Sequence, residues 1–205
     1  TLSRVYESVA EFIGPTIVKV GNRKFWNAMF DYLNLDDAKR RSAFVLIDKK
    51  DKLRDFAGAL TEEIGADATN EIIKVFTDGY RAFVKKSENL DLAIAELDNF
   101  MKLLTAMGIK NAQIDLGIMR GHAYYTGVVF EFFLQNFPEL GAIGGGGRYE
   151  DLASKFSKTK IIGVGAAVGF SRMMVALMDE GKIDLTSFEQ PIDVAVLVMG
   201  ENQVV

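Results

Sequence analysis

Apolar residues recur every three or four positions through the first half of the chain, the spacing that places them on one face of an α-helix. The stripe is clearest over residues 22–33, where Phe25, Trp26 and Phe30 share a face. Gly108 follows the last apolar stripe and is typical of a helix C-cap. The pattern predicts helices over residues 1–14, 22–33, 51–60, 68–76, 78–85 and 90–107.

From residue 112 onward the period changes to that of β-strands. Short segments rich in β-branched and aromatic residues are separated by Gly, Asn and Pro, a pattern typical of antiparallel strands joined by hairpins. One more helix is expected over residues 170–180, a polar linker over 182–191 and a buried-type strand over 192–200 that has no partner in this chain. Extended segments are predicted over residues 16–20, 112–116, 124–134, 141–146 and 160–168.

Composition narrows the possible functions. The 205 residues are 49% hydrophobic and 25% charged, which predicts a globular domain with a sizeable core. A net charge of −4 argues against a protein that coats nucleic acid nonspecifically, because that mode needs a dense basic face. The chain lacks cysteine and has a single histidine, so thiolate chemistry is excluded and a zinc site of the usual composition is not expected.

The start of the chain shows no signal-peptide pattern, and no run of about 18 apolar residues occurs. A cytoplasmic protein without membrane partners is therefore expected. The first residue is Thr1 rather than methionine, so we expect the chain to be a piece of a longer protein.

The segment from Gly163 to Gly169 lacks bulky side chains along most of its length. Such residues weaken a strand interior unless something approaches its surface closely. A flat ligand such as a purine ring would meet that need, and the guanidinium of Arg172 in the next helix could stack on the ring or hold a phosphate. Alternatively, the small residues only accommodate a helix packed on the sheet, and Arg172 is a solvated surface residue.

Two earlier segments carry further candidate residues. The glycines at 144–147 supply unobstructed backbone donors that suit an anion, although a flexible hairpin would have the same composition. In a regular strand Tyr124 and Tyr125 point to opposite faces, so one packs in the core while the other offers its hydroxyl to a site. Arg120 precedes them at the strand entrance, where a guanidinium could bridge a carboxylate and a phosphate.

His122 and Glu131 have two interpretations each. His122 either takes a direct chemical role or only tunes its neighbours at the strand entrance, and no serine or carboxylate partner in the pattern supports the first. Glu131 lies among phenylalanines, where a carboxylate either recognises a cationic or hydrogen-donating group or faces solvent.

Three motifs together carry a specific resemblance. They are Arg120-Gly121-x-x-Tyr124-Tyr125-Thr126-Gly127, Gly146-Gly147-Arg148-Tyr149 and Gly165-x-x-x-Gly169-Phe170-x-Arg172. In this order and at these intervals they resemble the catalytic domain of the histidyl-tRNA synthetases. The helical stretch to residue 110 looks like the part of that family between its second and third class II motifs, which includes a helical insertion. Residues 192–205 look like the first strand of its anticodon-binding domain.

The resemblance implies an α+β fold with a class II antiparallel sheet flanked by helices. Residues 1–188 would form a partial catalytic domain with its helical insertion at about 35–110. Residues 189–205 would form the linker and the first strand of a truncated anticodon-binding domain. The implied activity is activation of histidine by ATP with magnesium, followed by transfer to tRNA(His), in a homodimer without a tightly bound cofactor or resident metal.

The resemblance also assigns roles to single residues. Arg120 matches the catalytic arginine that holds the substrate carboxylate and the α-phosphate in the transition state, and it contacts ATP. The matching histidine-binding residues are Tyr124, Tyr125, Gly146, Gly147 and Tyr149. Arg172 and Gly169 match the ATP-binding residues of the third motif.

The chain departs from the family pattern in two ways. His122-Ala123 stands where the family usually has Leu-Asp, which alters the polarity of the pocket. Motifs 1 and 2 have no match, so this chain alone is expected to be unable to form an adenylate. The alternative is the regulatory subunit of ATP phosphoribosyltransferase, a paralogue that binds histidine without charging tRNA. Retention of Arg120 and Arg172 favours the enzyme, and His122-Ala123 favours the regulator.

Overall fold

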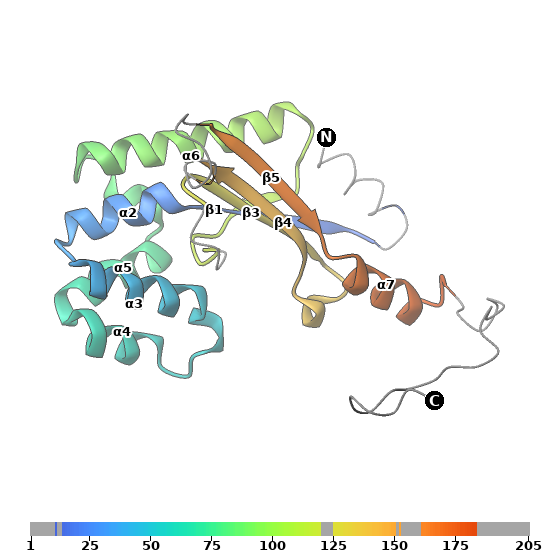
Figure 1. The fold of residues 1–205 in the computed structure, drawn as a ribbon, viewed down its shortest axis with the longest axis horizontal. Helices are drawn as coiled ribbons and strands as arrows, with labels where there is room; N and C mark the ends of the chain where they lie inside the picture. The colour runs from blue at the N-terminus through green and yellow to red at the C-terminus, as the bar shows by residue number, and fades with distance from the viewer. Residues whose placement is uncertain (1–10, 12–13, 120–124, 151, 153–160, 184–205) are drawn as a thin grey trace, which may run out of the picture.

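The computed structural model describes residue 11 and residues 14–119, 125–150, 152 and 161–183. Within these residues a five-stranded sheet is flanked by six α-helices (Figure 1). The strands are β1 (Thr16–Asn22), β2 (Ala112–Ile114), β3 (Val128–Leu134), β4 (Ala142–Tyr149) and β5 (Gly163–Val168). The helices are α2 (Arg23–Tyr32), α3 (Asp37–Asp48), α4 (Phe56–Ile64), α5 (Ala66–Thr77), α6 (Glu88–Ala106) and α7 (Phe170–Asp179). Three short 3-10 turns are η1 (Lys50–Lys52), η2 (Tyr80–Phe83) and η3 (Pro138–Leu140).

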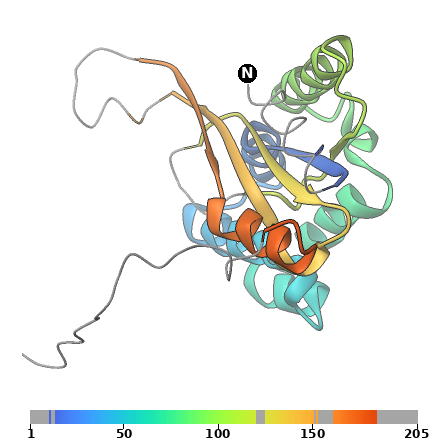
Figure 2. The ribbon, with the colours of Figure 1, turned by 90° about the vertical axis from the view of Figure 1, so that its right-hand side faces the viewer.

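The strands follow the order β2-β1-β3-β4-β5 across the sheet. All neighbours are antiparallel except β2, which runs parallel to β1. Helices α2 to α6 gather at the β1 side, and β5 and α7 lie at the opposite side (Figures 1 and 2). The expected antiparallel direction of β2 was wrong, because the chain returns from β1 through the whole helical layer and so re-enters the sheet in the same direction.

The turn from β1 into α2 is fixed by Asn22, which is fully buried. Its side-chain oxygen accepts hydrogen bonds from the backbone N–H groups of Lys24 (2.7 Å) and Phe25 (3.3 Å), so it is the N-cap of α2. Its amide nitrogen donates to Glu96 of α6 at 2.9 Å. One residue therefore joins β1, α2 and α6.

The core lies between the helices and the sheet. Phe25, Trp26 and Phe30 of α2 are completely buried, with the Phe25 and Trp26 rings edge to face at a centroid distance of 5.6 Å. The indole N–H of Trp26 donates to the carbonyl of Leu116 at 2.8 Å, so the largest core side chain has its polar atom satisfied. The predicted helical stripe of residues 22–33 is thus confirmed as the main core contact of α2.

Several predicted boundaries need correction. The helix predicted over residues 78–85 is only the 3-10 turn η2, because Gly79 and Lys85 at its two ends both have positive φ angles. The helix predicted from residue 51 begins at Phe56, where Asp55 caps it by accepting from the N–H of Gly58. Helix α3 was not predicted as a separate element, because only Ala43 and Ile47 of its 12 residues are buried. Most of residues 1–14, and all of 184–205, lie outside the described residues.

Candidate functional site

The strand register separates two faces of the sheet. Val129 and Glu131 of β3 pair with Gly147 and Gly145 of β4, and Gly147 pairs with Gly165 of β5. Directly paired residues share a face, so these side chains lie on one side, which we call the tyrosine face because Tyr149 lies on it. The opposite face carries the alternate residues and packs against α6, so we call it the helix face.

Tyr125 packs on the tyrosine face directly against Gly147. Its side chain is 8% exposed and clusters with Ile118 and Val129. A β-carbon added to Gly147 would lie 2.7 Å from Cδ1 of Tyr125 and 2.9 Å from the carbonyl oxygen of Val128. Only glycine therefore lets this tyrosine ring reach the sheet, so two of the predicted histidine-binding residues are in contact.

Tyr149 uses the glycines of β5 in the same way. A β-carbon at Gly163 would lie 2.2 Å from Cε2 of Tyr149, whereas one at Gly165 would lie 3.4 Å from Cε1. The small residues of this strand thus make room for a tyrosine ring. Packing therefore explains Gly163 without a flat ligand, whereas the contact at Gly165 is an ordinary one that a methyl group would also allow.

Gly146 differs from its neighbours in position. It pairs with Phe130 and Ala166 and therefore belongs to the helix face. A β-carbon there would lie 2.1 Å from the carbonyl oxygen of Gly165, so glycine is required for the close approach of β4 and β5. The structure brings Gly147 and Tyr149 together with Tyr125 but places Gly146 on the other side of the strand.

The segment that leads into Arg120 is held by several hydrogen bonds. Asp115 accepts from the N–H of Gly117 at 2.9 Å and from Nζ of Lys19 at 3.0 Å. Arg23 donates to the carbonyl of Met119 at 3.4 Å, and its guanidinium lies 4.3 Å from the ring centre of Phe44. Burial lowers the pKa of Arg23, and the nearby Asp48 partly opposes this shift. Arg120, His122 and Tyr124 themselves lie outside the described residues.

The charged pair of Lys19 and Asp115 lies beside Glu131. Lys19 is the direct cross-strand neighbour of Glu131, and its Nζ lies 4.9 Å from the ring centre of Phe133. On the other side Glu131 is opposite Gly145, which has no side chain. The carboxylate of Glu131 is therefore on the tyrosine face rather than on the helix face. Sequence reasoning overlooked Lys19 and Asp115, and their only signal was the charge of Lys19 within an otherwise apolar strand.

Arg172 and Gly169 connect α7 to the start of β4. The N–H of Gly169 donates to the carbonyl of Ile143 at 2.6 Å, and a β-carbon at Gly169 would lie 2.8 Å from that oxygen. Arg172 is exposed and donates to the carbonyl of Ala142. From Ala142 to Gly147 the strand covers about 17 Å at roughly 3.3 Å per residue. Arg172 and Gly169, two of the predicted ATP-binding residues, thus lie at one end of β4, and Tyr125 and Tyr149 lie at the other.

Among the described residues, no three side chains of His, Cys, Asp and Glu gather where they could hold a metal ion. None of the helices in the described part of the chain is both long and apolar enough to cross a membrane.

The sequence matches the family model of histidyl-tRNA synthetase over residues 3–177. The chain belongs to the histidyl-tRNA synthetase family. The histidine–tRNA ligase of Stenotrophomonas maltophilia is 34% identical over 193 residues, covering 84% of this chain and 42% of the relative. That of Finegoldia magna is 33% identical, covering 85% of this chain and 44% of the relative.

Solved structures agree with this assignment. The histidyl-tRNA synthetase of Nostoc sp. PCC 7120 superposes with a TM-score of 0.78 at 29% identity, covering 89% of this chain and 46% of that one. A Bacillus halodurans protein described as an ATP phosphoribosyltransferase regulatory subunit/histidyl-tRNA synthetase superposes at 0.70 with 20% identity, covering 86% of this chain and 48% of that one, which shows the shared fold. This synthetase-family chain spans less than half the length of these relatives.

Proposed function

We propose that the protein containing this chain is a histidine–tRNA ligase. It would activate histidine with ATP and magnesium, release pyrophosphate and transfer the histidyl group to tRNA(His). The observation that carries the proposal lies on one face of the sheet, where Tyr125 contacts Gly147 of β4 and Tyr149 of β4 contacts Gly163 of β5. The other end of β4 is bonded to Arg172 through Ala142. An aminoacyl adenylate joins an amino acid to a nucleotide, so its site must be long enough to hold both parts.

The tyrosines suit the recognition of an imidazole. A neutral imidazole presents one N–H donor and one nitrogen acceptor, and a buried tyrosine hydroxyl can serve either. An amino acid without those atoms would leave the hydroxyl unpaired, which disfavours apolar competitors. In this proposal Tyr124, Tyr125, Tyr149 and Gly147 line the histidine pocket, whereas Gly146, on the helix face, serves the close approach of β4 and β5.

The arginines would act on the phosphates. Arg120 would stabilise the charge that develops on the α-phosphate as the histidine carboxylate attacks and pyrophosphate leaves. Arg172 and Gly169 would lie at the ATP end of the site, and the guanidinium of Arg172 would exchange its hydrogen bond with Ala142 for a phosphate. We further propose that the enzyme is a cytoplasmic class II homodimer, as the family resemblance implies.

Histidine-dependent exchange of pyrophosphate into ATP tests the proposal, using the complete gene product. We expect exchange that requires histidine and that Arg120→Ala reduces far more than it weakens histidine binding, because the arginine acts in the transition state. Histidine binding without any exchange would instead favour the regulatory-subunit alternative, for which the His122-Ala123 departure is the supporting observation.

A further inference from the structure

Arg23, the first residue of α2, is bonded to the chain at two points on either side of the predicted site residues. Its guanidinium donates to the carbonyl of Met119 at 3.4 Å, and its backbone N–H donates to the carbonyl of Gly127 at 3.0 Å. Met119 directly precedes Arg120. Gly127 comes shortly after the Tyr124-Tyr125 pair. One residue thus holds both flanks of the segment 120–126, which we call the site segment.

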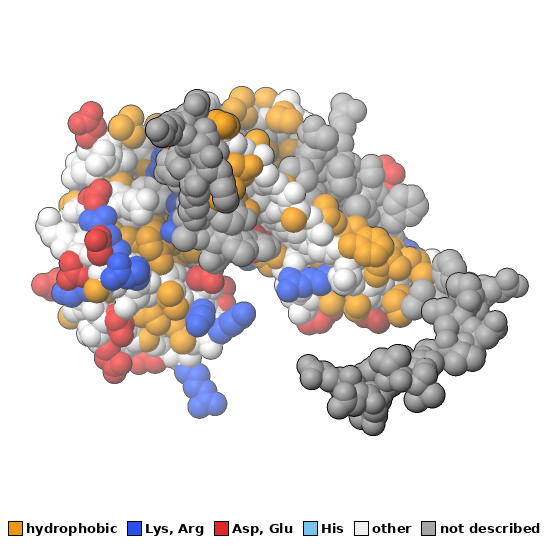
Figure 3. Space-filling view, in the orientation of Figure 1, with side chains coloured by type: hydrophobic (Ala, Val, Ile, Leu, Met, Phe, Trp, Pro, Cys, Tyr) orange, Lys and Arg blue, Asp and Glu red, His pale blue; other side chains and the backbone are white. Residues whose placement is uncertain are grey.

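The guanidinium of Arg23 is half-buried between α3 and Met119. It lies 4.3 Å from the ring centre of Phe44, and burial lowers its pKa. By contrast, Lys and Arg side chains over α3 and α4 lie in view at the surface (Figure 3). Withdrawing a charged group from water is unfavourable, so the contacts with Phe44 and Met119 offset that cost. The ring also limits where the guanidinium can lie, and hence where it donates.

Upstream of Met119 the backbone is anchored by other groups. The indole N–H of Trp26 donates to the carbonyl of Leu116 at 2.8 Å, and the carboxylate of Asp115 accepts from the N–H two residues later at 2.9 Å. Loss of the Arg23 guanidinium leaves both bonds in place. Its effect should therefore be confined to Met119 and the residues that follow it.

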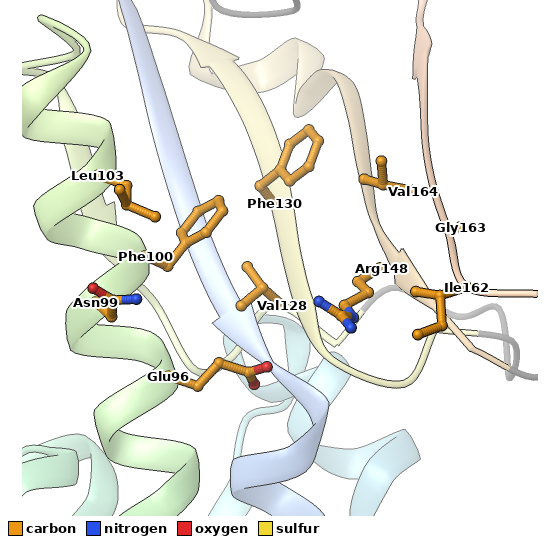
Figure 4. A pocket seen from close by; sticks show the side chains of 10 residues that line it. All are labelled: Glu96, Asn99, Phe100, Leu103, Val128, Phe130, Arg148, Ile162, Gly163 and Val164. Atoms are coloured by element: carbon orange, nitrogen blue, oxygen red, sulfur yellow. The ribbon is translucent and has the colours of Figure 1, made fainter.

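The Gly127 flank depends on backbone bonds instead. Besides the bond from the N–H of Arg23, the N–H of Thr126 donates to the carbonyl of Arg148 at 2.9 Å. Val128 is buried beside a groove of about 380 Å³ between α6 and β5, which Arg148 also lines (Figure 4). The guanidinium of Arg23 therefore supports the flank next to the predicted catalytic arginine, and backbone bonds support the flank next to the tyrosines.

We propose that Arg23 is a positioning residue for Arg120: its guanidinium, held against Phe44, fixes the Met119 carbonyl and with it the start of the site segment. The inference rests on the proposed ligase activity, in which Arg120 stabilises the transition state. A displaced Arg120 loses stabilisation of the charge that develops on the α-phosphate, and this loss lowers kcat rather than histidine binding. The helical layer thereby influences catalysis without touching a substrate.

Arg23→Met tests the proposal, because it keeps an unbranched side chain against Phe44 and removes the donor. Arg40→Met is the matched control on α3. Arg40 donates to the carbonyl of Leu35 at 2.7 Å and pairs with Asp31 at 2.6 Å, so both of these partners lie in the helical layer rather than beside the site segment. The complete gene product is assayed by histidine-dependent exchange of pyrophosphate into ATP.

The expected result is a split between the kinetic constants. Arg23→Met should lower kcat at least tenfold and change the KM for histidine less than threefold, whereas Arg40→Met should change kcat less than twofold. Arg23→Lys keeps a cationic donor on a long side chain and should recover part of the lost kcat. Arg23→Gln repeats the measurement if Arg23→Met does not fold.

Three results would overturn the proposal. Equal losses of kcat in Arg23→Met and Arg40→Met would make Arg23 an ordinary structural contact. A loss carried by the KM for histidine would show that the side chain supports the tyrosines rather than Arg120. An Arg23→Lys variant no faster than Arg23→Met would show that the donor does not matter.

The same assay separates failure of this inference from failure of the proposed function. A wild-type protein without histidine-dependent exchange would refute the ligase proposal, and the role of Arg23 with it. An active wild type beside an equally active Arg23→Met would refute the role of Arg23 alone.

Discussion

The two lateral ends of the sheet, which we call its sides, differ in how completely they are packed. One is the side of β1 and β2 with α2 to α6, and the other is the side of β5 with α7. On the side of α2 to α6, Phe25, Trp26 and Phe30 are completely buried, and Asn22 ties strand and helices together. On the side of β5 and α7, Ala176 is the one buried residue within 161–183, and Phe170 is 69% exposed. The first side has a core of its own, whereas the described residues of the second bury little.

The residues of the candidate site lie on both sides of the sheet, the helical side and the β5 side. Tyr125 packs with Ile118 and Val129, next to a segment held by the helical side. Tyr149 lies over Gly163 of β5, which belongs to the sparsely packed side. The candidate site thus joins a part supported by the helical core to a part that is sparsely packed in the described residues.

The largest effect is expected from removing the centre of the packed side. Trp26→Ala should lower the free energy of unfolding by about 3–5 kcal/mol, because it leaves a large cavity and an unpaired carbonyl at Leu116. Urea denaturation measures the loss. Leu92→Ala is the control on α6, since Leu92 is 63% exposed and should change stability by less than about 0.5 kcal/mol. Similar losses for both variants would show that the burial of Trp26 does not set its contribution to stability.

Gly163→Ala tests the position of Tyr149 on the tyrosine face, at the sparsely packed side. The new methyl would lie 2.2 Å from the Tyr149 ring, so the ring must move, at a cost of about 1–3 kcal/mol. Gly165→Ala is a close control, because its methyl would meet the same ring at an ordinary 3.4 Å. In pyrophosphate exchange we expect Gly163→Ala to raise the KM for histidine at least tenfold and Gly165→Ala to leave it nearly unchanged. Equal KM values would show that the position of Tyr149 does not matter for histidine.

Asp115→Ala tests whether the packed side positions Arg120. The change removes the acceptor of Gly117 and the partner of Lys19, and should reduce stability by about 1–2 kcal/mol. It should also lower the exchange rate constant more than it raises the KM for histidine, because Arg120 follows this segment. Asp51→Ala removes an exposed pair with Lys50 and is the control. A loss of stability with an unchanged rate constant would limit Asp115 to a structural role.

Much of this architecture could be predicted from the sequence, for reasons that particular residues make clear. The stripe containing Phe25, Trp26 and Phe30 predicted α2, because burial on one face imposes the 3.6-residue period. The β3–β5 strands were expected because β-branched and glycine-rich segments alternate with turns. Helix α3 was missed because its buried positions are too few to give a period, and η2 was misassigned because positive φ angles at its ends are invisible to periodicity.

The site was predictable in its residue types but not in its contacts. The motifs identified Tyr125, Gly147 and Tyr149, yet only the register showed that Gly146 lies on the other face. The glycines of β5 were thought to admit a ligand, whereas Gly163 and Gly165 lie under a tyrosine from the neighbouring strand. Such contacts depend on which strands pair, and no local sequence pattern shows that pairing. The binding and catalytic roles of all the predicted site residues stay predictions.

The smallest effect is expected at the edge of the packed side, where Tyr80 and Arg81 of η2 bind Asp98 of α6 at 2.5 and 2.8 Å. Burial and the hydrogen bond to Asp98 raise the pKa of Tyr80 to about 12. Burial alone would raise the pKa of Asp98, but the hydrogen bonds from Arg81 and Tyr80 lower it below 3.8 overall. Tyr80→Phe should cost about 1 kcal/mol near neutral pH.

That cost should depend on pH in a defined way. A raised pKa favours the protonated phenol in the folded state, so its stabilisation is complete below pH 10 and is lost as the pH rises towards 12. The lowered pKa of Asp98 gives the opposite sign, so its contribution is lost as the pH falls below 3.8. Denaturation of wild type and Tyr80→Phe should therefore differ most between these limits. In an Asp98→Asn background the tyrosine change should have much less effect, and an unchanged difference there would show that Tyr80 stabilises the helical side without Asp98.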